Sequence, residues 1–277
     1  MASRSDLVSG FAPSGEAKIY FEAAGSGAPL VFIHAGVSDS RMWDPQFELF
    51  AERFRVVRYD HRGFGRSLMT DEPYSMRGDL LNVLRHLKIS KATLVGCSMG
   101  GAAAIDFALD HPEMVSALVL VGSGVSGLND PSQLSEDSIK HWNTLLGLLQ
   151  KHDYEEAREL DATFWIDGPG REVAQIDPEY RERARELHRQ NFMVDRFAHQ
   201  EEQLKPPAIG RLGEISVPTL IVIGDHDGRD LIALAHRMVH EIPNAELVTI
   251  QNAAHLPSLE HPRQFNRLLA DFLAAHS

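Results

Sequence analysis

Short apolar runs alternate with amphipathic stretches along most of the chain. Seven of these runs are rich in β-branched residues and are predicted as strands: residues 18–24, 29–35, 54–60, 92–98, 115–123, 218–225 and 245–253. Five stretches between them have helical spacing and are predicted as helices: 43–54, 76–89, 99–112, 229–242 and 261–276. The later strands are almost continuously apolar, as strands covered on both faces need to be. The pattern therefore predicts an α/β fold, a mostly parallel sheet of about eight strands with helices on both faces.

One region breaks this alternation. Residues 126–210 contain no convincing strand, and three of its segments read as helices: 137–152, 153–168 and 177–194. Their many Glu and Arg residues are interpreted as solvated helix faces rather than a binding patch. We expect residues 126–210 to form a helical cap, inserted between two parts of one core, 1–125 and 211–277.

Composition narrows the class of protein. The chain has 277 residues, 43% apolar and 24% charged, which is enough to bury a large core without disulfides or metal. The single cysteine cannot form an internal disulfide, and neither a signal-peptide pattern nor an apolar run of about 18 residues is present. We expect a soluble, cytoplasmic protein. The net charge of −12 argues against nucleic acid and anionic membranes as partners.

The stretch "VGCSMGG", residues 95–101, holds two candidate nucleophiles, Cys97 and Ser98. Its G-x-S-x-G lies between a predicted strand and a predicted helix, the context of a nucleophile elbow. That turn is so tight that the residues two before and two after the nucleophile must lack bulk. Ser98 has Gly96 and Gly100 there, whereas Cys97 has a valine and a methionine. We predict that Ser98 is the nucleophile and that Cys97 packs behind it; the alternative is a serine that only caps the helix.

A serine hydroxyl needs a base, and the base needs a carboxylate to orient it. His255 follows the last predicted strand and could reach Ser98 over the strand ends. The segment "LIVIGDHDGRD" ends another strand and offers three carboxylates, Asp225, Asp227 and Asp230.

Four stretches outside the cap carry a family resemblance: "FIHAG" with Trp43 nine residues after His34, "YDHRGFGRS", "GCSMGG", and "GDHD" followed by "AAHLPSLEHP". Together they resemble the α/β-hydrolase superfamily, in its serine-nucleophile, esterase- and lactonase-like branch. The resemblance implies the chain order Ser…Asp…His. Its G-x-x-D pattern places the acid at Asp227, so that Asp225 caps or braces the loop.

The resemblance also implies an oxyanion hole made of two backbone amides, from Met99 and from Gly36. Ala35 stands where the family usually has glycine. A backbone donor does not depend on its own side chain, but alanine resists a positive φ. His34 is interpreted as a brace for this loop rather than as a catalytic acid. Residues 60–67 are interpreted as loop architecture held by glycines and arginines, and the alternative is a contact with the substrate.

Aromatic residues of the cap are candidates for lining an acyl pocket. They are Trp142, Phe164, Trp165 and Phe192, with Met193 beside them. The alternative is that they only pack the cap. Some cap residues must roof the site if the cap folds over the strand ends.

Two other motifs are set aside. Gly122–Gly127 matches G-x-G-x-x-G and follows a strand, but a loop comes next and no second strand ends in an acid at the expected distance. Residues 225–230 resemble a calcium loop only superficially, and there is no H-E-x-x-H or cysteine cluster. We predict no cofactor and no metal.

These residues predict a serine hydrolase that cleaves a small carboxylic ester or lactone through an acyl-enzyme. A carbon–carbon bond hydrolase of ring-cleavage products, or an enol-lactonase of aromatic catabolism, would use the same triad. A ligand-binding receptor on the same scaffold is an alternative from another class. A serine at the elbow argues against the dehalogenases and epoxide hydrolases of the superfamily, which use an aspartate. The sequence indicates neither the acyl and alcohol parts of the substrate nor the oligomeric state.

Overall fold

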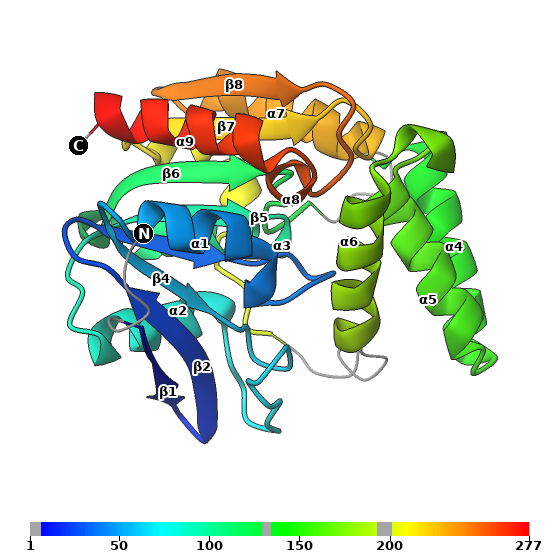
Figure 1. Cartoon of the computed structure of the whole chain (residues 1–277). Helices are drawn as coiled ribbons and strands as arrows, with labels where there is room; N and C mark the ends of the chain where they lie inside the picture. The colour runs from blue at the N-terminus through cyan, green and yellow to red at the C-terminus, as the bar shows by residue number, and fades with distance from the viewer. Residues whose placement is uncertain (1–6, 129–133, 193–200, 277) are drawn as a thin grey trace.

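An eight-stranded sheet forms the centre of the protein, in a computed structural model that describes residues 7–128, 134–192 and 201–276 (Figure 1). The strands are β1 Val8–Ser14, β2 Ala17–Ala24, β3 Pro29–Ile33, β4 Arg55–Tyr59, β5 Ala92–Cys97, β6 Val115–Val121, β7 Thr219–Gly224 and β8 Ala245–Ile250. Their order is β1-β2-β4-β3-β5-β6-β7-β8, and all pairs from β4 to β8 are parallel. This confirms the predicted α/β architecture.

The strand β1 is the one that the hydrophobic pattern did not predict. It pairs antiparallel with β2 at the edge of the sheet, and it contains Gly10 and Pro13. Both residue types are depleted in strands, and proline is tolerated mainly at sheet edges. The strand is half exposed, so it also lacks the continuous apolar run of the central strands.

Helices cover both faces of the sheet (Figure 1). Outside the cap they are α1 Asp44–Phe50, α2 Met76–His86, α3 Met99–Asp110, α7 Arg229–Glu241, α8 Pro257–Glu260 and α9 Pro262–Ala275. Short 3₁₀ turns lie at Ser40–Trp43, Pro112–Met114, Val173–Gln175, Ala208–Gly210 and Leu212–Glu214. One buried cluster joins the sheet to α2, α3 and α7, and another joins it to α1 and α9.

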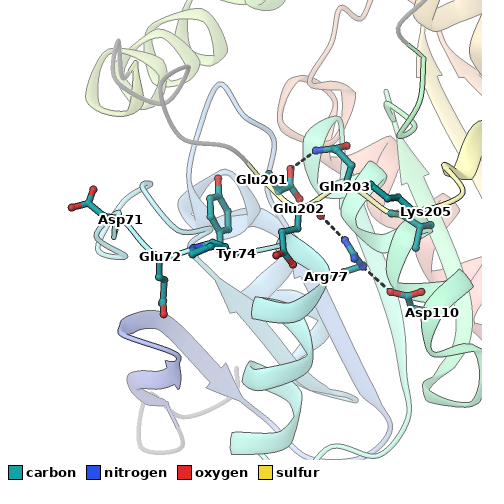
Figure 2. Close-up of a pocket in the computed structure, with 11 residues that line it drawn as sticks. Asp71, Glu72, Tyr74, Arg77, Asp110, Glu201, Glu202, Gln203 and Lys205 are labelled. Atoms are coloured by element: carbon teal, nitrogen blue, oxygen red, sulfur yellow. Dashed lines mark hydrogen bonds and ion pairs between the residues drawn. The ribbon is translucent and has the colours of Figure 1, made fainter.

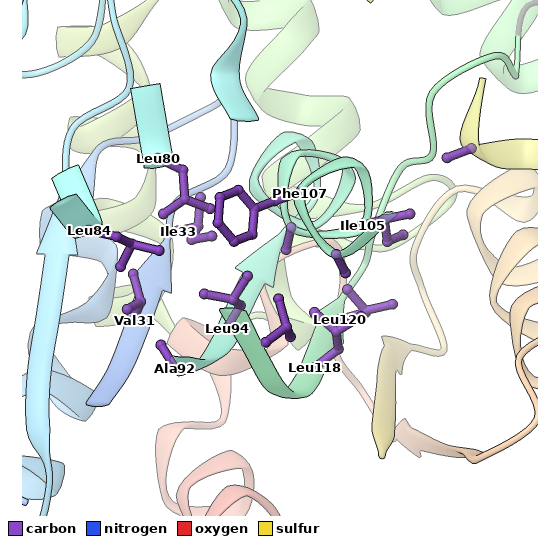
Figure 3. Close-up of a cluster of buried hydrophobic side chains, with 14 of the residues drawn as sticks. Val31, Ile33, Leu80, Leu84, Ala92, Leu94, Ile105, Phe107, Leu118 and Leu120 are labelled. Atoms are coloured by element: carbon purple, nitrogen blue, oxygen red, sulfur yellow. The ribbon is translucent and has the colours of Figure 1, made fainter. Parts of the chain in front are cut away.

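The strands alternate their side chains between these two clusters. In β3, Val31 and Ile33 pack towards α2 and α3, whereas Leu30 and Phe32 pack towards α1 and α9. Figure 3 shows the first cluster, where Phe107 of α3 lies among strand residues and leucines of α2. Burial on both faces explains why the central strands are almost continuously apolar.

The segment predicted as a cap supplies three further helices between β6 and β7: α4 Glu136–Gln150, α5 Tyr154–Ala162 and α6 Pro178–Asn191. Ser135 caps α4 by accepting the Ser138 amide, and Asp177 caps α6 by accepting the Tyr180 amide. A π-helical turn, Thr163–Asp167, continues α5. The three helices stand together beyond one end of the sheet (Figure 1). No helix in the described ranges is long and apolar enough to cross a membrane.

The start of α3 depends on close backbone packing that only glycine permits. A Cβ at Gly96 would lie 2.4 Å from the carbonyl oxygen of Gly100. A Cβ at Gly100 would lie 2.4 Å from the carbonyl oxygen of Ile33, which belongs to β3. Both distances are far inside van der Waals contact, and the obstacle is backbone that cannot rotate away.

We predict that Gly96→Ala lowers the free energy of unfolding by about 1–3 kcal/mol, because the new methyl group forces α3 away from the sheet. Gly147→Ala is the matched control, since a Cβ there meets nothing within 4 Å. Gly147 lies inside α4, so its replacement should raise stability by about 0.5–1 kcal/mol. Urea unfolding of both variants measures the difference, and a Gly96→Ala protein as stable as wild type would contradict the prediction.

Candidate active site

Ser98 occupies the sharp turn between β5 and α3. Its backbone has φ +53° and ψ −115°, a conformation that residues other than glycine rarely adopt. The surroundings hold it there: the Ser98 amide donates to the Val121 carbonyl at 2.9 Å, and the Ser98 carbonyl accepts from the amides of Ala102 and Gly124 at 3.0 and 3.2 Å. Strain of this kind costs about 1–3 kcal/mol and persists only where neighbouring structure imposes it.

The side chain of Ser98 makes no capping hydrogen bond to α3. The alternative that this serine only caps the helix is therefore wrong. Ser98 instead lines a cavity of about 440 Å³, together with Met99 and His255.

His255 and Asp227 are hydrogen-bonded to each other. Nδ1 of His255 lies 3.0 Å from both carboxylate oxygens of Asp227, and one of these oxygens also accepts the Gly228 amide at 2.7 Å. Both side chains are almost fully buried. Because Nδ1 donates its proton to the carboxylate, Nε2 is left as the basic nitrogen of the ring.

The other two carboxylates of this segment, Asp225 and Asp230, have structural roles. Asp225 accepts the Ala253 amide at 3.2 Å, which braces the loop, as expected. Asp230 accepts the hydroxyls of Ser135 and Ser138 at 3.2 and 2.7 Å, and so ties α7 to the start of α4.

Gly122 is a site residue that the motif analysis missed. It follows β6 with φ +50°, and a Cβ there would lie 3.0 Å from Asp227 and 3.2 Å from Nδ1 of His255. The G-x-G-x-x-G that it opens thus has a packing role, since it leaves room for the Asp227–His255 pair. The sequence signal that could have revealed this role is that Gly122 directly follows a central strand.

Cys97 is fully buried in the cluster beneath α1 and α9. Its Sγ lies 3.9 Å from the carbonyl oxygen of His255. Burial, and then the charge of Asp227, raise the pKa of the thiol well above its usual value. Because the thiolate is the reactive form, this cysteine is inert, and the prediction that it packs behind Ser98 is confirmed.

The loop after β3 carries the second predicted oxyanion donor, Gly36. Gly36 lines the cavity with Ser98 and Met99, the first residue of α3. Ala35 does not adopt a positive φ, so the alanine that replaces the family's glycine causes no strain. The Ala35 amide donates to Sδ of Met42 at 3.3 Å.

His34 braces this loop, as the sequence predicted. Its Nδ1 donates to the Ala35 carbonyl at 2.8 Å, and its Nε2 accepts the His61 amide at 2.9 Å. Burial lowers the pKa of His34, which keeps the ring neutral and both bonds intact. Asp60 holds the loop of residues 60–67 in place, because it accepts the amides of Ser40 and Arg66 at 3.0 and 2.9 Å. The same loop also lines the cavity, through His61, Arg62 and Phe64.

The cap covers the cavity with two of its four candidate aromatics. Trp142 and Trp165 line the cavity. Phe164 and Phe192 are not among the described residues that line it: Phe164 stacks on His141 at 4.2 Å between ring centroids, and Phe192 lies against His188. These two pack the cap instead, and Met193 lies outside the described residues.

A buried carboxylate, Asp161, organises the cap around Trp165. It accepts from Nε1 of Trp165 at 3.0 Å, and it is paired with Nε2 of His141 and of His188 at 3.2 and 2.9 Å. These partners come from α4, the π-helical turn and α6. Trp165 is thereby held with its ring 4.5 Å from that of His255.

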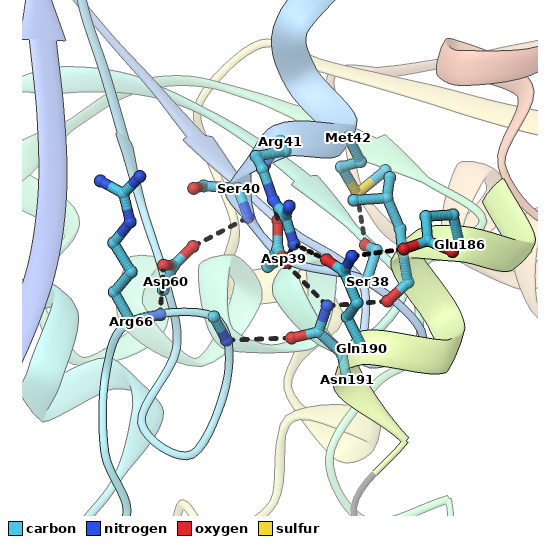
Figure 4. A network of polar contacts seen from close by, with 12 residues as sticks. Ser38, Asp39, Ser40, Arg41, Met42, Asp60, Arg66, Glu186, Gln190 and Asn191 are labelled. Atoms are coloured by element: carbon cyan, nitrogen blue, oxygen red, sulfur yellow. Dashed lines mark hydrogen bonds and ion pairs between the residues drawn. The ribbon is translucent and has the colours of Figure 1, made fainter. Parts of the chain in front are cut away.

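A second polar network ties the cap to the core (Figure 4). Asn191, the last residue of α6, donates to Asp39 at 2.7 Å and accepts the Gly65 amide at 2.9 Å. Asp39 also receives two hydrogen bonds from the Arg41 guanidinium. The end of α6 is therefore joined to both loops that border the cavity.

No group of three or more His, Cys, Asp or Glu side chains is placed to hold a metal ion within the described ranges. The polar groups around the cavity instead form pairs and short chains of hydrogen bonds. They are suited to proton transfer and to holding loops in place.

Asp39 makes stability depend on pH. Burial opposes its charge, but hydrogen bonds from Arg41 and Asn191 lower its pKa to about 2. A carboxylate with a depressed pKa stabilises the folded state above its unfolded pKa, and this contribution is lost as the pH falls towards 2. Here it is on the order of 2 kcal/mol.

We therefore predict that Asp39→Asn lowers the free energy of unfolding above pH 5. The gap, meaning the difference in this free energy between wild type and variant, should shrink by about half at pH 3. Urea unfolding between pH 3 and pH 7 measures the gap. Asp153→Asn is the control, because this exposed carboxylate makes no capping bond. It should change stability by less than about 0.5 kcal/mol. A gap for Asp39→Asn that stays constant with pH would contradict the prediction.

Comparison with known proteins places this chain in a family. The chain is 30% identical over 268 residues to a 2-hydroxy-6-oxononadienedioate/2-hydroxy-6-oxononatrienedioate hydrolase of Paraburkholderia phymatum, covering 93% of this chain and 91% of that one. It is 29% identical to a 2-hydroxy-6-oxo-6-phenylhexa-2,4-dienoate hydrolase of Comamonas testosteroni, covering 92% and 91%.

Among solved structures, Est816, described as an N-acyl homoserine lactone degrading enzyme, superposes with a TM-score of 0.76 at 28% identity, covering 95% of this chain and all of that one. The family model of the alpha/beta hydrolase fold matches residues 28–262. The chain belongs to the alpha/beta hydrolase family.

Proposed function

We propose that this protein is a serine hydrolase that works through an acyl-enzyme, with Ser98, His255 and Asp227 as its catalytic triad. The observation that carries the proposal is the strained backbone of Ser98, whose side chain lines the same cavity as the hydrogen-bonded His255. A backbone held in a costly conformation, with its hydroxyl left out of helix capping, is typical of a functional site.

In the proposed mechanism, Oγ of Ser98 attacks the substrate carbonyl carbon while Nε2 of His255 takes its proton. Asp227 stabilises the imidazolium that forms. The amides of Met99 and Gly36 receive the oxyanion, and Met99 supplies the positive end of α3.

The tetrahedral intermediate then collapses, and His255 gives the proton to the leaving group. Water, deprotonated by His255, attacks the acyl-enzyme and releases the acid, which restores Ser98.

A small carboxylic ester or lactone is the first candidate substrate. The cavity is mainly apolar, with side chains such as Val37, Phe64, Met69 and Leu231 in its wall, and its volume of about 440 Å³ suits a small acyl group. Likeness to Est816, a lactone-degrading enzyme, supports this class.

Carbon–carbon bond hydrolysis is the second candidate. The relatives from Paraburkholderia and Comamonas are hydrolases of 2-hydroxy-6-oxo-dienoic acids, and the bond open to hydrolysis in such compounds lies beside the ketone. These sequence relatives favour the second candidate over the first. The same Ser98, His255 and Asp227 would serve it, as they would an enol-lactonase.

We predict that Ser98→Ala lowers turnover of p-nitrophenyl butyrate by about 10⁴-fold or more, because no other described group at the elbow is activated as a nucleophile. Cys97→Ala is the matched control, since it changes the adjacent residue without widening the turn. It should retain most activity. A loss above 100-fold, about 2.7 kcal/mol in the activation barrier, would show that Cys97 contributes to the reaction and does not merely pack behind Ser98.

Fluorophosphonate labelling of the native protein tests the same serine without a chosen substrate. Modification at Ser98 is expected, and its loss in Ser98→Ala. A ligand-binding receptor on this scaffold would instead leave Ser98 unlabelled under native conditions.

A substrate panel separates the two candidate classes. It contains p-nitrophenyl esters of two to eight acyl carbons, γ-lactones, and a 2-hydroxy-6-oxo-6-phenyl dienoate followed by loss of its absorbance. The first candidate predicts that kcat/KM is highest for a short ester or a lactone, and the second predicts that it is highest for the dienoate. A preference for the dienoate by tenfold or more, abolished in Ser98→Ala, would make carbon–carbon hydrolysis the function.

A further inference from the structure

We propose that Glu201 is a specificity-determining residue that disfavours substrates whose acyl part carries a carboxylate, so that of two otherwise matched substrates the enzyme prefers the one with the uncharged acyl part. The inference rests on the proposed serine hydrolase function and narrows its substrate class. Glu201 lines the cavity that contains Ser98, and it also lines a surface pocket of about 910 Å³ (Figure 2). Its carboxylate therefore stands in the wall between the two.

The position of this carboxylate is set by its neighbours. One oxygen accepts the Met76 amide at 3.0 Å, and the other accepts Nε2 of Gln203 at 3.3 Å. The Glu202 amide donates to the Tyr74 carbonyl at 2.7 Å, which holds this segment alongside Tyr74. These hydrogen-bond partners are neutral. The charge of Arg77 also acts on Glu201, but its guanidinium is paired with Asp110 and donates to the Glu202 carbonyl, so Glu201 makes no direct ion pair with it.

Glu201 is only partly exposed to solvent. Burial raises the pKa of Glu201, and burial followed by the charge of Glu201 raises the pKa of Tyr74 to about 12. A second negative charge brought next to Glu201 would be screened weakly here, because charge repulsion grows as the local dielectric falls.

The cavity offers a carboxylate little compensation. Among its described lining residues, Arg62 is the one permanently charged cation, and all five of its N–H donors are used within the protein. Two go to Asp79 at 3.1 and 2.7 Å, and one each to Glu72, Thr70 and the Ser14 carbonyl. A substrate anion would have to displace one of these bonds.

His61 does not supply the missing charge. It lines the cavity, but burial lowers its pKa well below the usual value, so the ring stays neutral. The surface pocket beyond Glu201 repels anions as well. Its described lining includes five acidic residues, Asp71, Glu72, Asp110, Glu201 and Glu202, and two basic residues, Arg77 and Lys205. Arg77 is paired with Asp110 at 2.7 Å and Glu72 with Arg62 at 2.9 Å, whereas Glu201 and Glu202 stand beside Lys205, so the described lining carries a net negative charge.

Two esters that differ only in this charge test the inference: mono-p-nitrophenyl adipate, which keeps a free carboxylate, and methyl p-nitrophenyl adipate, which does not. At pH 8 and low salt the wild type should prefer the methyl ester. The ratio of kcat/KM for the carboxylate ester to that for the methyl ester is the readout. Because each variant is compared with itself, the ratio does not depend on the fraction of folded protein.

In Glu201→Gln this ratio should rise at least about tenfold, mainly through a lower KM for the carboxylate ester, since repulsion acts on binding before chemistry begins. The glutamine can still accept the Met76 amide. Glu202→Gln removes the same charge from the next residue, which lines the surface pocket but not the cavity. There the ratio should stay within about twofold.

An unchanged ratio in Glu201→Gln, or an equal rise in Glu202→Gln, would overturn the inference while ester hydrolysis itself still supports the proposed function. A wild-type preference for the carboxylate ester would overturn it too. Ester hydrolysis that persists in Ser98→Ala would contradict the proposed function instead, and the inference with it.

Discussion

The close approach of α3 to the end of β5 is the constraint on which the site depends. Gly96 and Gly100 let the helix backbone meet the sheet where a single methyl group would collide with a carbonyl oxygen. Only in that packing does Ser98 keep its positive φ, with bonds to Val121 and Gly124. The strain at this residue is offset by these hydrogen bonds and by the packing of the surrounding structure.

The cap contributes Trp142 and Trp165 to the wall of the cavity that contains Ser98. Asp161 holds Trp165 against His255, and Asn191 joins the end of α6 to the loops on either side of the cavity. A mainly apolar enclosure strengthens every electrostatic interaction inside it, including the pair formed by Asp227 and His255. The same enclosure makes the charge of Glu201 matter for substrate choice. Membership of the family fixes the fold, whereas the choice of substrate depends on the residues that line the cavity.

Much of the fold and of the candidate site could be predicted from the sequence, and the features that were not predicted have physical explanations. The central strands were predictable because burial on both faces demands continuous apolar runs, while β1, an exposed edge strand with glycine and proline, carries no such signal. Trp142 and Trp165 could not be told from Phe164 and Phe192, because helical spacing does not reveal which side of the cap faces the cavity. Gly122 looked like part of a nucleotide motif because its neighbours, Asp227 and His255, are distant in sequence.

The sequence by itself determined the α/β architecture, the elbow at Ser98 and the inert position of Cys97, because each follows from local patterns of burial and bulk. The family resemblance already pointed to Asp227 as the partner of His255, but only the tertiary structure decided where the other carboxylates lie. Asp161 holds Trp165, Asp39 joins α6 to the core, and Glu201 stands beside the cavity of Ser98. Charge interactions depend on distance and solvent exposure rather than on spacing along the chain, so they are set when distant segments pack together.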